Sequence, residues 1–336
     1  MKCSLEFIRF IFICIIAIWH DNTLNIFKHS VVVEFFFILS GFLLYKTYQK
    51  NAAEPIEFAR RRLKRLYCEY SIALIITFFI NIIKEPSNEV FIYNQIGSLI
   101  PELFMVQNIG IFEGGINPIN WYIQVMLIGS IFLYSLLYCN PKLAKNILIP
   151  TLALGGLTYL FSTGDSVVRW ETNGFIYLPL LRGLSCMSIG ILSAWVYLEA
   201  KCKSCLSLFI INISSILTIV FIIIATRIQN PLDKYVIMLS PLAIIACFEE
   251  KSWLNKIFHA KWQLWLGHIS YAILLIHCAY IPVFHKLLSE LRLIFHLEIS
   301  LGISIALYIL TLTMVAALFQ ELCDIIRNKF SIFLIN

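Results

Sequence analysis

Long apolar segments separated by short polar connections run through the whole chain. A helix needs about 20 mostly apolar residues to cross the hydrocarbon core of a bilayer. Several segments of the 336-residue sequence reach or approach this length. We therefore expect about ten transmembrane helices, at about 6–20, 31–48, 66–84, 119–138, 147–162, 175–198, 206–226, 232–248, 264–284 and 298–322.

The composition agrees with an all-α, polytopic membrane protein. The sequence is 60% hydrophobic and 14% charged, whereas a soluble domain of this size carries about 25% charged residues. The connections between the apolar segments are too short to hold a hydrolase or a nucleotide-binding domain. Residues 1–336 are therefore interpreted as a single transmembrane domain without a soluble appendage.

The positions of Lys and Arg predict the orientation of the chain. With the N-terminus inside, 17 of the 26 Lys and Arg residues fall in inside connections and 7 fall outside, while Arg9 and Arg182 lie within apolar segments. Cytoplasmic connections typically carry such an excess. With an even number of spans, both termini are expected in the cytoplasm. The net charge of +6 then reflects topology, and no nucleic-acid partner is expected.

The longest outside connection, at about 85–118, contains an apolar stretch from Leu99 to Val106 among several Pro and Gly residues. Such a stretch can fold back onto the membrane surface and shape a substrate entrance. A simple connector would explain it equally well.

Arg9 and His20 stand out in the first apolar segment, because ten mostly apolar residues separate them. An Arg at the centre of a membrane helix costs about 2.5–3.5 kcal/mol on insertion scales, so it suggests a functional site. Eleven helical steps return to within about 20° of the start and rise about 16 Å. One helix face therefore carries a cation at its inner end and an imidazole at its outer end.

The second segment brings a carboxylate toward this imidazole. Glu34 lies near the outer end of that segment, and the short connection makes the two helices antiparallel. A carboxylate on one imidazole nitrogen raises the basicity of the other, as a general base for a hydroxyl requires. Asp21 is a rival for this role. Ser40 and Gly41 lie deeper, where a Gly allows close approach by a ligand chain or by another helix.

A basic run precedes the third segment, with five cations between residues 60 and 65. It can contact anionic lipid headgroups. It can also bind phosphate, because Arg makes bidentate contacts with phosphate oxygens. The two functions are compatible.

Two later segments also contain polar groups. Arg182 lies in the outer half of the sixth segment, where it could reach the interface with its long side chain or take part in a site. In the ninth segment, Ser270 and His277 share a face because they are seven residues apart. A membrane histidine can also simply bond to a neighbouring carbonyl.

The ten cysteines indicate neither disulfides nor a metal centre. None lies in an expected outside connection, where oxidising conditions would favour disulfides. Cys202 and Cys205 form a lone pair with two residues between them, and a structural zinc site needs four ligands. We therefore expect reduced thiols and no bound metal.

Together these motifs resemble the acyltransferase-3 family of integral membrane acyltransferases. The stretch Leu5-Glu6-Phe7-Ile8-Arg9 followed by His20 is similar to the family's first-span signature. The stretch 33–42, Val-Glu-Phe-Phe-Phe-Ile-Leu-Ser-Gly-Phe, resembles its second-span signature. Further similarities are the basic run 62–65, the Asn120-Trp121-Tyr122 stretch, Arg182 with Gly190, and Ser270-Tyr271 with His277.

The resemblance implies an acyl-CoA donor, usually acetyl-CoA, supplied from the cytoplasm and not bound as a permanent cofactor. It implies a hydroxyl acceptor on a cell-surface glycan or a lipid-linked sugar, and a location in the bacterial cytoplasmic (inner) membrane. The expected acyl-CoA-binding residues are Arg9, Ser40, Gly41, Arg61, Arg62 and Arg65, and the expected acceptor-side residues are Trp121, Arg182, Ser270, Tyr271 and His277.

His20 would act as a general base, oriented by Glu34, or would carry the acyl group briefly, with Arg9 positioning the donor. The acyl chain length, the identity of the acceptor and the oligomeric state stay open. The alternative is a transporter or flippase for a lipid-linked or small anionic substrate, because buried Arg, Glu and His also serve transport.

Overall fold

The computed structural model describes residues 2–24, 26–27, 31–107, 115–164, 166–168, 170–202, 207–228, 232–296 and 299–333. Helices make up 82% of it. The helices are α1 (Cys3–His20), α2 (Val32–Lys50), α3 (Pro55–Lys84), α4 (Glu89–Leu103), α5 (Asn120–Cys139), α6 (Pro141–Leu143), α7 (Ile149–Ser162), α8 (Leu178–Cys202), α9 (Leu208–Ala225), α10 (Asp233–Phe248), α11 (Trp253–Ile257), α12 (Lys261–Phe295) and α13 (Leu301–Phe333). A π-helical turn, η1 (Ala144–Leu148), joins α6 to α7, and the strands β1 (Thr172–Asn173) and β2 (Ile176–Tyr177) pair antiparallel.

Each of the ten predicted segments coincides with a helix, and within the described ranges eight helices are long and apolar enough to cross a membrane. These eight are α1, α3, α5, the continuous stretch Pro141–Ser162, α8, α9, α12 and α13. The other two predicted segments are α2 and α10. Both are largely buried, and they pack against each other. A helix surrounded by protein does not need a fully apolar surface, so α2 accommodates the buried Glu34. Lys46 and the exposed Lys50 lie toward its C-terminal end.

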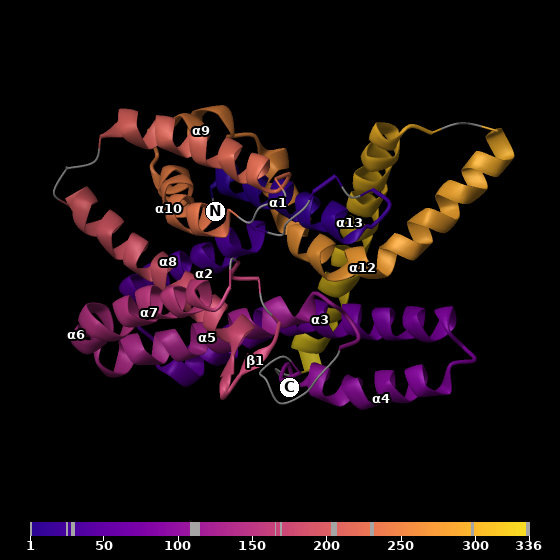
Figure 1. Cartoon of the computed structure of the whole chain (residues 1–336), viewed down its shortest axis with the longest axis horizontal. Helices are drawn as coiled ribbons and strands as arrows, with labels where there is room; N and C mark the ends of the chain where they lie inside the picture. Colours follow the sequence, from indigo (N-terminus) through magenta and orange to yellow (C-terminus); the bar gives the residue numbers. More distant parts are fainter. Residues whose placement is uncertain are drawn as a thin grey trace. The chain divides into compact units, whose positions relative to one another are not determined.

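Helix α4 folds back beside α3, within the stretch predicted to be an outside connection (Figure 1). Asn88 caps its N-terminus, because the Asn88 side chain accepts a hydrogen bond of 3.0 Å from the backbone N–H of Phe91. The Nδ2 of Asn81 on α3 donates to the Oε1 of Gln95 on α4, at 3.0 Å. The apolar stretch in this connection is therefore partly helical, and Ile100 and Phe104 within it are exposed.

The chain divides into two compact units, each assembled from distant stretches of sequence. One contains Met1–Leu5, Phe27–Leu63 and Tyr122–Lys261, and the other contains Glu6–Ile26, Lys64–Trp121 and Trp262–Asn336. We call them the Glu34 unit and the His20 unit, after one residue in each.

The Glu34 unit is built around α2, which packs against α8 and α10, while α7 also packs against α8. Two glycines let α2 and α8 approach closely. A side chain at Gly41 would overlap the backbone of Met187 on α8, and one at Gly190 would overlap the backbone of Ile38 on α2. Small residues at such crossings are typical of membrane helix pairs.

The His20 unit places α1 beside α12, with the two helices running in the same direction. Gly267 near the start of α12 lies against Glu6 near the start of α1, and His277 lies beside His20 at the end of α1. Helix α12 changes direction along its length (Figure 1). Pro282 inside it explains the bend, because a proline has no N–H for the carbonyl four residues earlier.

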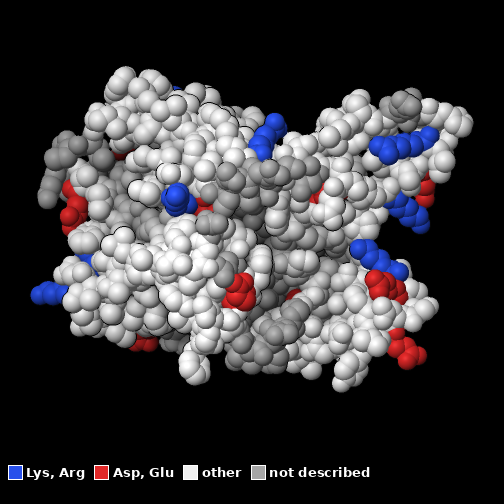
Figure 2. Space-filling view, viewed as in Figure 1, with Lys and Arg blue, Asp and Glu red and all other residues white. Residues whose placement is uncertain are grey.

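Charged side chains are sparse on the face shown in Figure 2. Large apolar side chains are exposed on several helices, for example Phe79 on α3, Leu217 on α9 and Leu318 on α13. Together with the eight long apolar helices, this surface identifies a multi-pass membrane protein.

Candidate functional site

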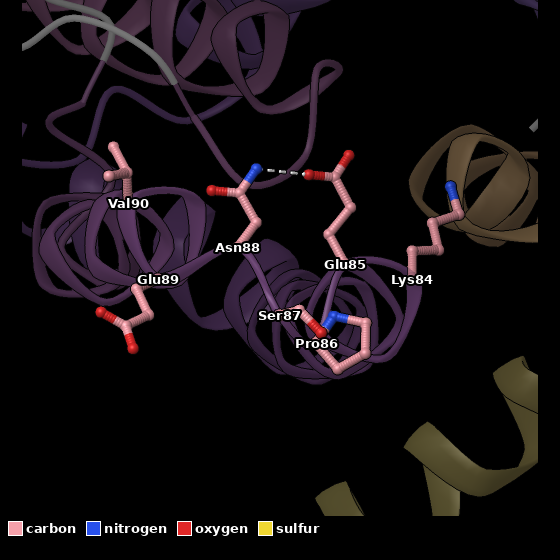
Figure 3. A pocket seen from close by; sticks show the side chains of 7 residues that line it. All are labelled: Lys84, Glu85, Pro86, Ser87, Asn88, Glu89 and Val90. Carbon is pink, nitrogen blue, oxygen red and sulfur yellow. Dashed lines mark hydrogen bonds between the residues drawn. The ribbon is translucent and has the colours of Figure 1, made fainter.

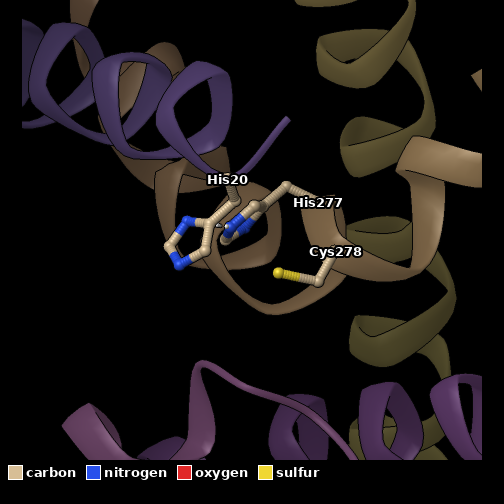
Figure 4. A group of neighbouring side chains, drawn as sticks. All are labelled: His20, His277 and Cys278. Carbon is tan, nitrogen blue, oxygen red and sulfur yellow. Dashed lines mark hydrogen bonds between the residues drawn. The ribbon is translucent and has the colours of Figure 1, made fainter. Parts of the chain in front are cut away.

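His20 is the last residue of α1 and faces His277 of α12 (Figure 4). The Nδ1 of His20 lies 3.3 Å from the Nε2 of His277, and the ring centroids are 5.0 Å apart. His277 is fully buried, whereas His20 is partly accessible. The sequence placed both residues in the site, but it did not predict that they would pair.

The hydrogen bonds around the pair assign the proton positions. The Nδ1 of His277 lies 2.8 Å from the carbonyl oxygen of Leu274 and 3.2 Å from that of Ile273, so this nitrogen donates. The Nε2 of His277 is then an acceptor. The Nδ1 of His20 faces this acceptor and also the carbonyl oxygen of Ile16 at 2.9 Å, so it carries the ring proton. The Nε2 of His20 is left with a lone pair, as a general base requires.

The carboxylates proposed to orient His20 have other partners. Asp21 accepts a 2.8 Å hydrogen bond from the hydroxyl of Thr23 and lies 2.9 Å from the Nε2 of His285. Glu34 belongs to the other unit, where its partner is Arg182. An effect of Glu34 on His20 therefore stays a prediction, and His277 is the residue observed to orient the imidazole within its own unit.

Arg9 is held in place by Glu6 one turn earlier on α1. The Nη1 of Arg9 donates to the Oε2 of Glu6 at 2.7 Å, and the Arg9 side chain is 24% exposed whereas that of Glu6 is 1% exposed. Gly267 of α12 packs directly on Glu6. The buried carboxylate thus fixes a guanidinium that still reaches accessible space, and the sequence analysis had not singled out Glu6 for this purpose.

The His20 unit brings Arg65 of α3 and Tyr271 of α12 near Arg9. Arg65 lies close enough to both for electrostatic interactions. The hydroxyl of Tyr271 donates to the carbonyl of Leu66 at 3.3 Å, which fixes the tyrosine against α3. Two neighbouring guanidinium groups repel each other unless an anion lies between them, so this arrangement suits a phosphate-bearing ligand.

Arg61 and Arg62 lie one turn earlier on α3 than Arg65. The Nε of Arg61 is 3.5 Å from the Oε1 of Glu57, in an exposed ion pair. The guanidinium of Arg62 lies over the ring of Phe58, at 5.9 Å from its centroid. Neither contact involves phosphate, so the role of Arg61 and Arg62 in binding phosphate stays a prediction.

Arg182 and Glu34 form a buried ion pair in the Glu34 unit. The Nε of Arg182 donates to the Oε1 of Glu34 at 2.8 Å, its Nη2 also contacts this oxygen, and both side chains are 0% exposed. Asp233 lies close enough to Glu34 to interact electrostatically. Asp233 also accepts a 3.0 Å hydrogen bond from the backbone N–H of Val167. Arg182 therefore points into the protein and does not extend to its surface.

The remaining site predictions concern Ser40, Gly41, Ser270 and Trp121. The close approach of the Met187 backbone explains why a glycine stands at position 41, because a side chain there would not fit. Contact of Ser40 and Gly41 with an acyl donor stays a prediction. Ser270 is buried and donates to a carbonyl of its own helix at 2.7 Å. Trp121 is buried at the start of α5.

The segment before Trp121 is fixed by Glu102 of α4, a residue that sequence reasoning missed. Its Oε1 accepts from the backbone N–H of Ile116, and its Oε2 accepts from the Nδ2 of Asn120 at 2.5 Å. Burial raises the pKa of Glu102 to about 7, although these hydrogen bonds act in the opposite direction. The Nδ2 of Asn117 donates to the carbonyl of Leu275 at 2.8 Å, which ties this segment to α12 two residues before His277.

A surface hollow lies at the turn between α3 and α4 and is lined by the stretch 84–90 (Figure 3). Asn88 and Glu85 bond across it, with the Asn88 Nδ2 donating at 2.9 Å. None of the predicted site residues lines this hollow.

The fold and the site define a polytopic helical membrane protein with a histidine pair at one end of α1 and a group of cations about 16 Å along the same helix. The family model described as an acyltransferase domain matches residues 4–319, so the chain belongs to the acyltransferase-3 family. The protein is therefore a membrane acyltransferase that uses an acyl donor and an acceptor. No curated protein and no solved structure matches the chain significantly.

Proposed function

We propose that the protein is an O-acetyltransferase that moves an acetyl group from cytoplasmic acetyl-CoA to a hydroxyl of a cell-surface glycan or lipid-linked sugar. The observation that carries this proposal is the histidine pair, in which His277 leaves the Nε2 of His20 unprotonated. An imidazole in this state can take the proton of a hydroxyl nucleophile.

The transfer then proceeds with His20 as general base. The Nε2 of His20 accepts the acceptor's hydroxyl proton while the hydroxyl oxygen attacks the thioester carbonyl. The bond between the carbonyl carbon and sulfur breaks, and His20 returns the proton to the CoA thiolate. The products are an acetyl ester and free CoA. In the other mechanism open to the same residue, the Nε2 of His20 attacks the thioester carbonyl first, the carbon–sulfur bond breaks and CoA leaves as the thiolate. The acceptor hydroxyl then takes the acetyl group from the imidazole, and its proton goes to the CoA thiolate.

The donor is proposed to enter on the cytoplasmic side, where the cations lie. Arg61, Arg62 and Arg65 would bind the phosphates of CoA at the inner mouth, and Arg9, close to Arg65, would position the donor. Tyr271, predicted on the acceptor side, lies close to Arg65, and its role stays a prediction. A helical rise of about 16 Å separates Arg9 from His20. A pantetheine arm spans a distance of this order, so the thioester can reach the imidazole. A longer acyl chain than acetyl fits the same scheme.

The acceptor is proposed to approach from the outer side. His277, Ser270 and Trp121 belong to the His20 unit and would line its path. Arg182 is also predicted on the acceptor side, and its partner within the Glu34 unit is Glu34.

This scheme corresponds to a single domain of ten spans in the bacterial inner membrane, with both termini in the cytoplasm. The parallel course of α1 and α12 supports it, because the first and the ninth of ten spans cross the membrane in the same direction. Among the ten predicted segments, the first corresponds to α1 and the ninth corresponds to α12.

The test is acetyl transfer from labelled acetyl-CoA in membranes that contain the full-length protein. We expect His20→Ala to lower the transfer rate by about 10²–10⁴-fold, the usual contribution of a general base. Arg9→Ala should mainly raise the KM for acetyl-CoA. His259→Ala is a matched control, since His259 is an exposed histidine whose Nδ1 lies 2.8 Å from the Lys256 carbonyl.

Wild-type transfer by well-expressed His20→Ala protein would contradict the proposal. Flux of a lipid-linked sugar without acetyl-CoA would instead identify a transporter or flippase.

A further inference from the structure

A third potential ligand lies beside the histidine pair. Cys278 follows His277 on α12, and its thiol points toward the two imidazoles (Figure 4). One ring nitrogen of His20, one of His277 and the Sγ of Cys278 all lie within 4.8 Å of one another. Cys278 is a free cysteine with intermediate exposure, and His20 is exposed to a similar degree, so two of the three groups are partly accessible. The proposed transfer does not use this thiol.

The distances fit a thiophilic divalent cation. Zn²⁺ binds imidazole nitrogen at about 2.0–2.1 Å and thiolate sulfur at about 2.3 Å, usually with tetrahedral geometry. Two nitrogens on one tetrahedral ion then stand about 3.3–3.4 Å apart. The Nδ1 of His20 and the Nε2 of His277 are 3.3 Å apart. A tetrahedral edge between nitrogen and sulfur is about 3.6 Å, and the ligand atoms lie within 4.8 Å of one another, so the thiol needs to approach by about 1.2 Å at most.

The local backbone allows this adjustment. Pro282 has no N–H to donate to the carbonyl of Cys278, which stands four residues earlier on α12. The helix bends in this region (Figure 1), so its regular hydrogen-bond ladder is interrupted at the turn that carries the thiol. Three protein ligands with a free fourth position are the set that proteins use for accessible zinc sites.

We propose that His20, His277 and Cys278 bind Zn²⁺ or a similar thiophilic divalent cation, and that binding stops acyl transfer. The Cys278 thiol releases its proton and binds as the thiolate. His20 binds through Nδ1, so its single ring proton moves to Nε2. That nitrogen then has no lone pair for the acceptor hydroxyl. The metal therefore inhibits by fixing the wrong tautomer, and this second half of the inference rests on the proposed function.

The metal-binding half is tested without any activity measurement. Purified full-length protein is titrated with Co²⁺, because a cobalt–thiolate bond gives an intense charge-transfer absorption band, and Zn²⁺ should displace the ion. We expect the band in the wild type and in Cys139→Ser, a control at an exposed free cysteine. Cys278→Ser should lose the band and bind Zn²⁺ at least tenfold more weakly.

A second measurement needs no variant. Zn²⁺ should slow the alkylation of Cys278 by a maleimide in the wild-type protein, as read by mass spectrometry of the peptide, and a chelator should restore the reaction. A missing cobalt–thiolate band, or Zn²⁺ without effect on this alkylation, would overturn the metal site.

The inhibition half uses the acetyl-transfer assay in membranes. Zn²⁺ should inhibit the wild type and Cys139→Ser, and a chelator should reverse the effect. Cys278→Ser should keep its basal rate and need at least tenfold more Zn²⁺ for the same inhibition. Full transfer with the metal bound would overturn the inhibition. If no variant transfers acetyl groups but the cobalt band still depends on Cys278, the proposed function fails and the metal site stands.

Discussion

The Nε2 of His277 accepts from the Nδ1 of His20 across 3.3 Å, so a residue on α12, together with the Ile16 carbonyl on α1, leaves the Nε2 of His20 free to act. This makes His277 a positioning residue for the proposed general base. The relationship resembles the way in which a third group orients the histidine of a catalytic triad, with an imidazole in place of a carboxylate.

Replacing His277 should therefore change the chemical step. We expect His277→Ala to lower kcat for acetyl transfer by about 10–100-fold, with little change in the KM for acetyl-CoA, because the His20 ring then loses one of the two acceptors that orient it. His277→Gln should recover part of the rate, since its amide oxygen can accept from His20. Steady-state kinetics of membrane preparations measure both parameters. Equal rates for the Ala and Gln variants would argue for a purely structural role.

The buried pair of Glu34 and Arg182 predicts strong non-additivity in stability. Removing one partner leaves a buried charge without its counterion, which costs about 3–5 kcal/mol. Glu34→Gln and Arg182→Gln should each lower the thermal unfolding midpoint in detergent, and the double variant should be less destabilised than the sum of the two. Simple additivity in this double-mutant cycle would show that the pair is not coupled.

The crossing of α2 and α8 predicts that Gly41→Ala is severely destabilising. The new methyl group would overlap the Met187 backbone, which cannot rotate away as a side chain could. Overpacking of this kind costs about 1–3 kcal/mol, and more where backbones must separate. Gly155→Ala on α7 is the control, because its nearest neighbour would lie at ordinary contact distance, 4.0 Å. Detergent thermal-shift measurements should show a lower midpoint for Gly41→Ala alone.

Glu102 predicts a pH-dependent stability of the segment before Trp121. Burial raises its pKa from 4.5 to about 7, so the folded state favours the protonated acid. The stabilisation is fully present below pH 4.5 and is lost as the pH rises through 7. The shift corresponds to roughly 3 kcal/mol. Unfolding midpoints of the wild type should therefore fall between pH 5 and pH 8.

Glu102→Gln should flatten this pH dependence. The Gln amide oxygen can still accept from Ile116, and Asn120 can turn its amide so that Oδ1 accepts from the new NH₂ group. Glu89→Gln, an exposed change on the same helix, should keep the wild-type slope. A slope that survives in Glu102→Gln would assign the pH dependence to another group.

Much of the helical framework was predictable, because apolar runs and their spacing are local properties of the chain. The positions of the ten segments, and the shared face of Arg9 and His20, needed only helix periodicity. Helix α4 was harder, because its 15 residues are too short for a span and its polar groups find partners on α3. The hydropathy pattern of the sequence does not reveal a helix that is stabilised by contacts with another helix.

The partners within the site were not predictable from spacing. Short connections suggested Glu34, or its rival Asp21, as the partner of His20. The partner observed within the His20 unit is His277, separated from it by 257 positions. Likewise, Arg182 finds Glu34 across 148 positions. These pairs depend on which helices pack together, and a single sequence contains no local signal for that choice. Cys278 and Glu6 became relevant only once α1 and α12 were seen side by side.

The pairing of α1 with α12 also determines when the enzyme can become active. Helix α1 precedes α12 in the chain, and His277 follows its contact His20 by 257 positions. Gly267 and His285, which contact α1 and the turn after it, also belong to α12. A nascent or truncated chain that lacks α12 contains His20 with the Ile16 carbonyl as its acceptor, but without His277. Synthesis of α12 thus acts as a timing control, because the histidine pair can assemble only after the helices that precede α12 have been made.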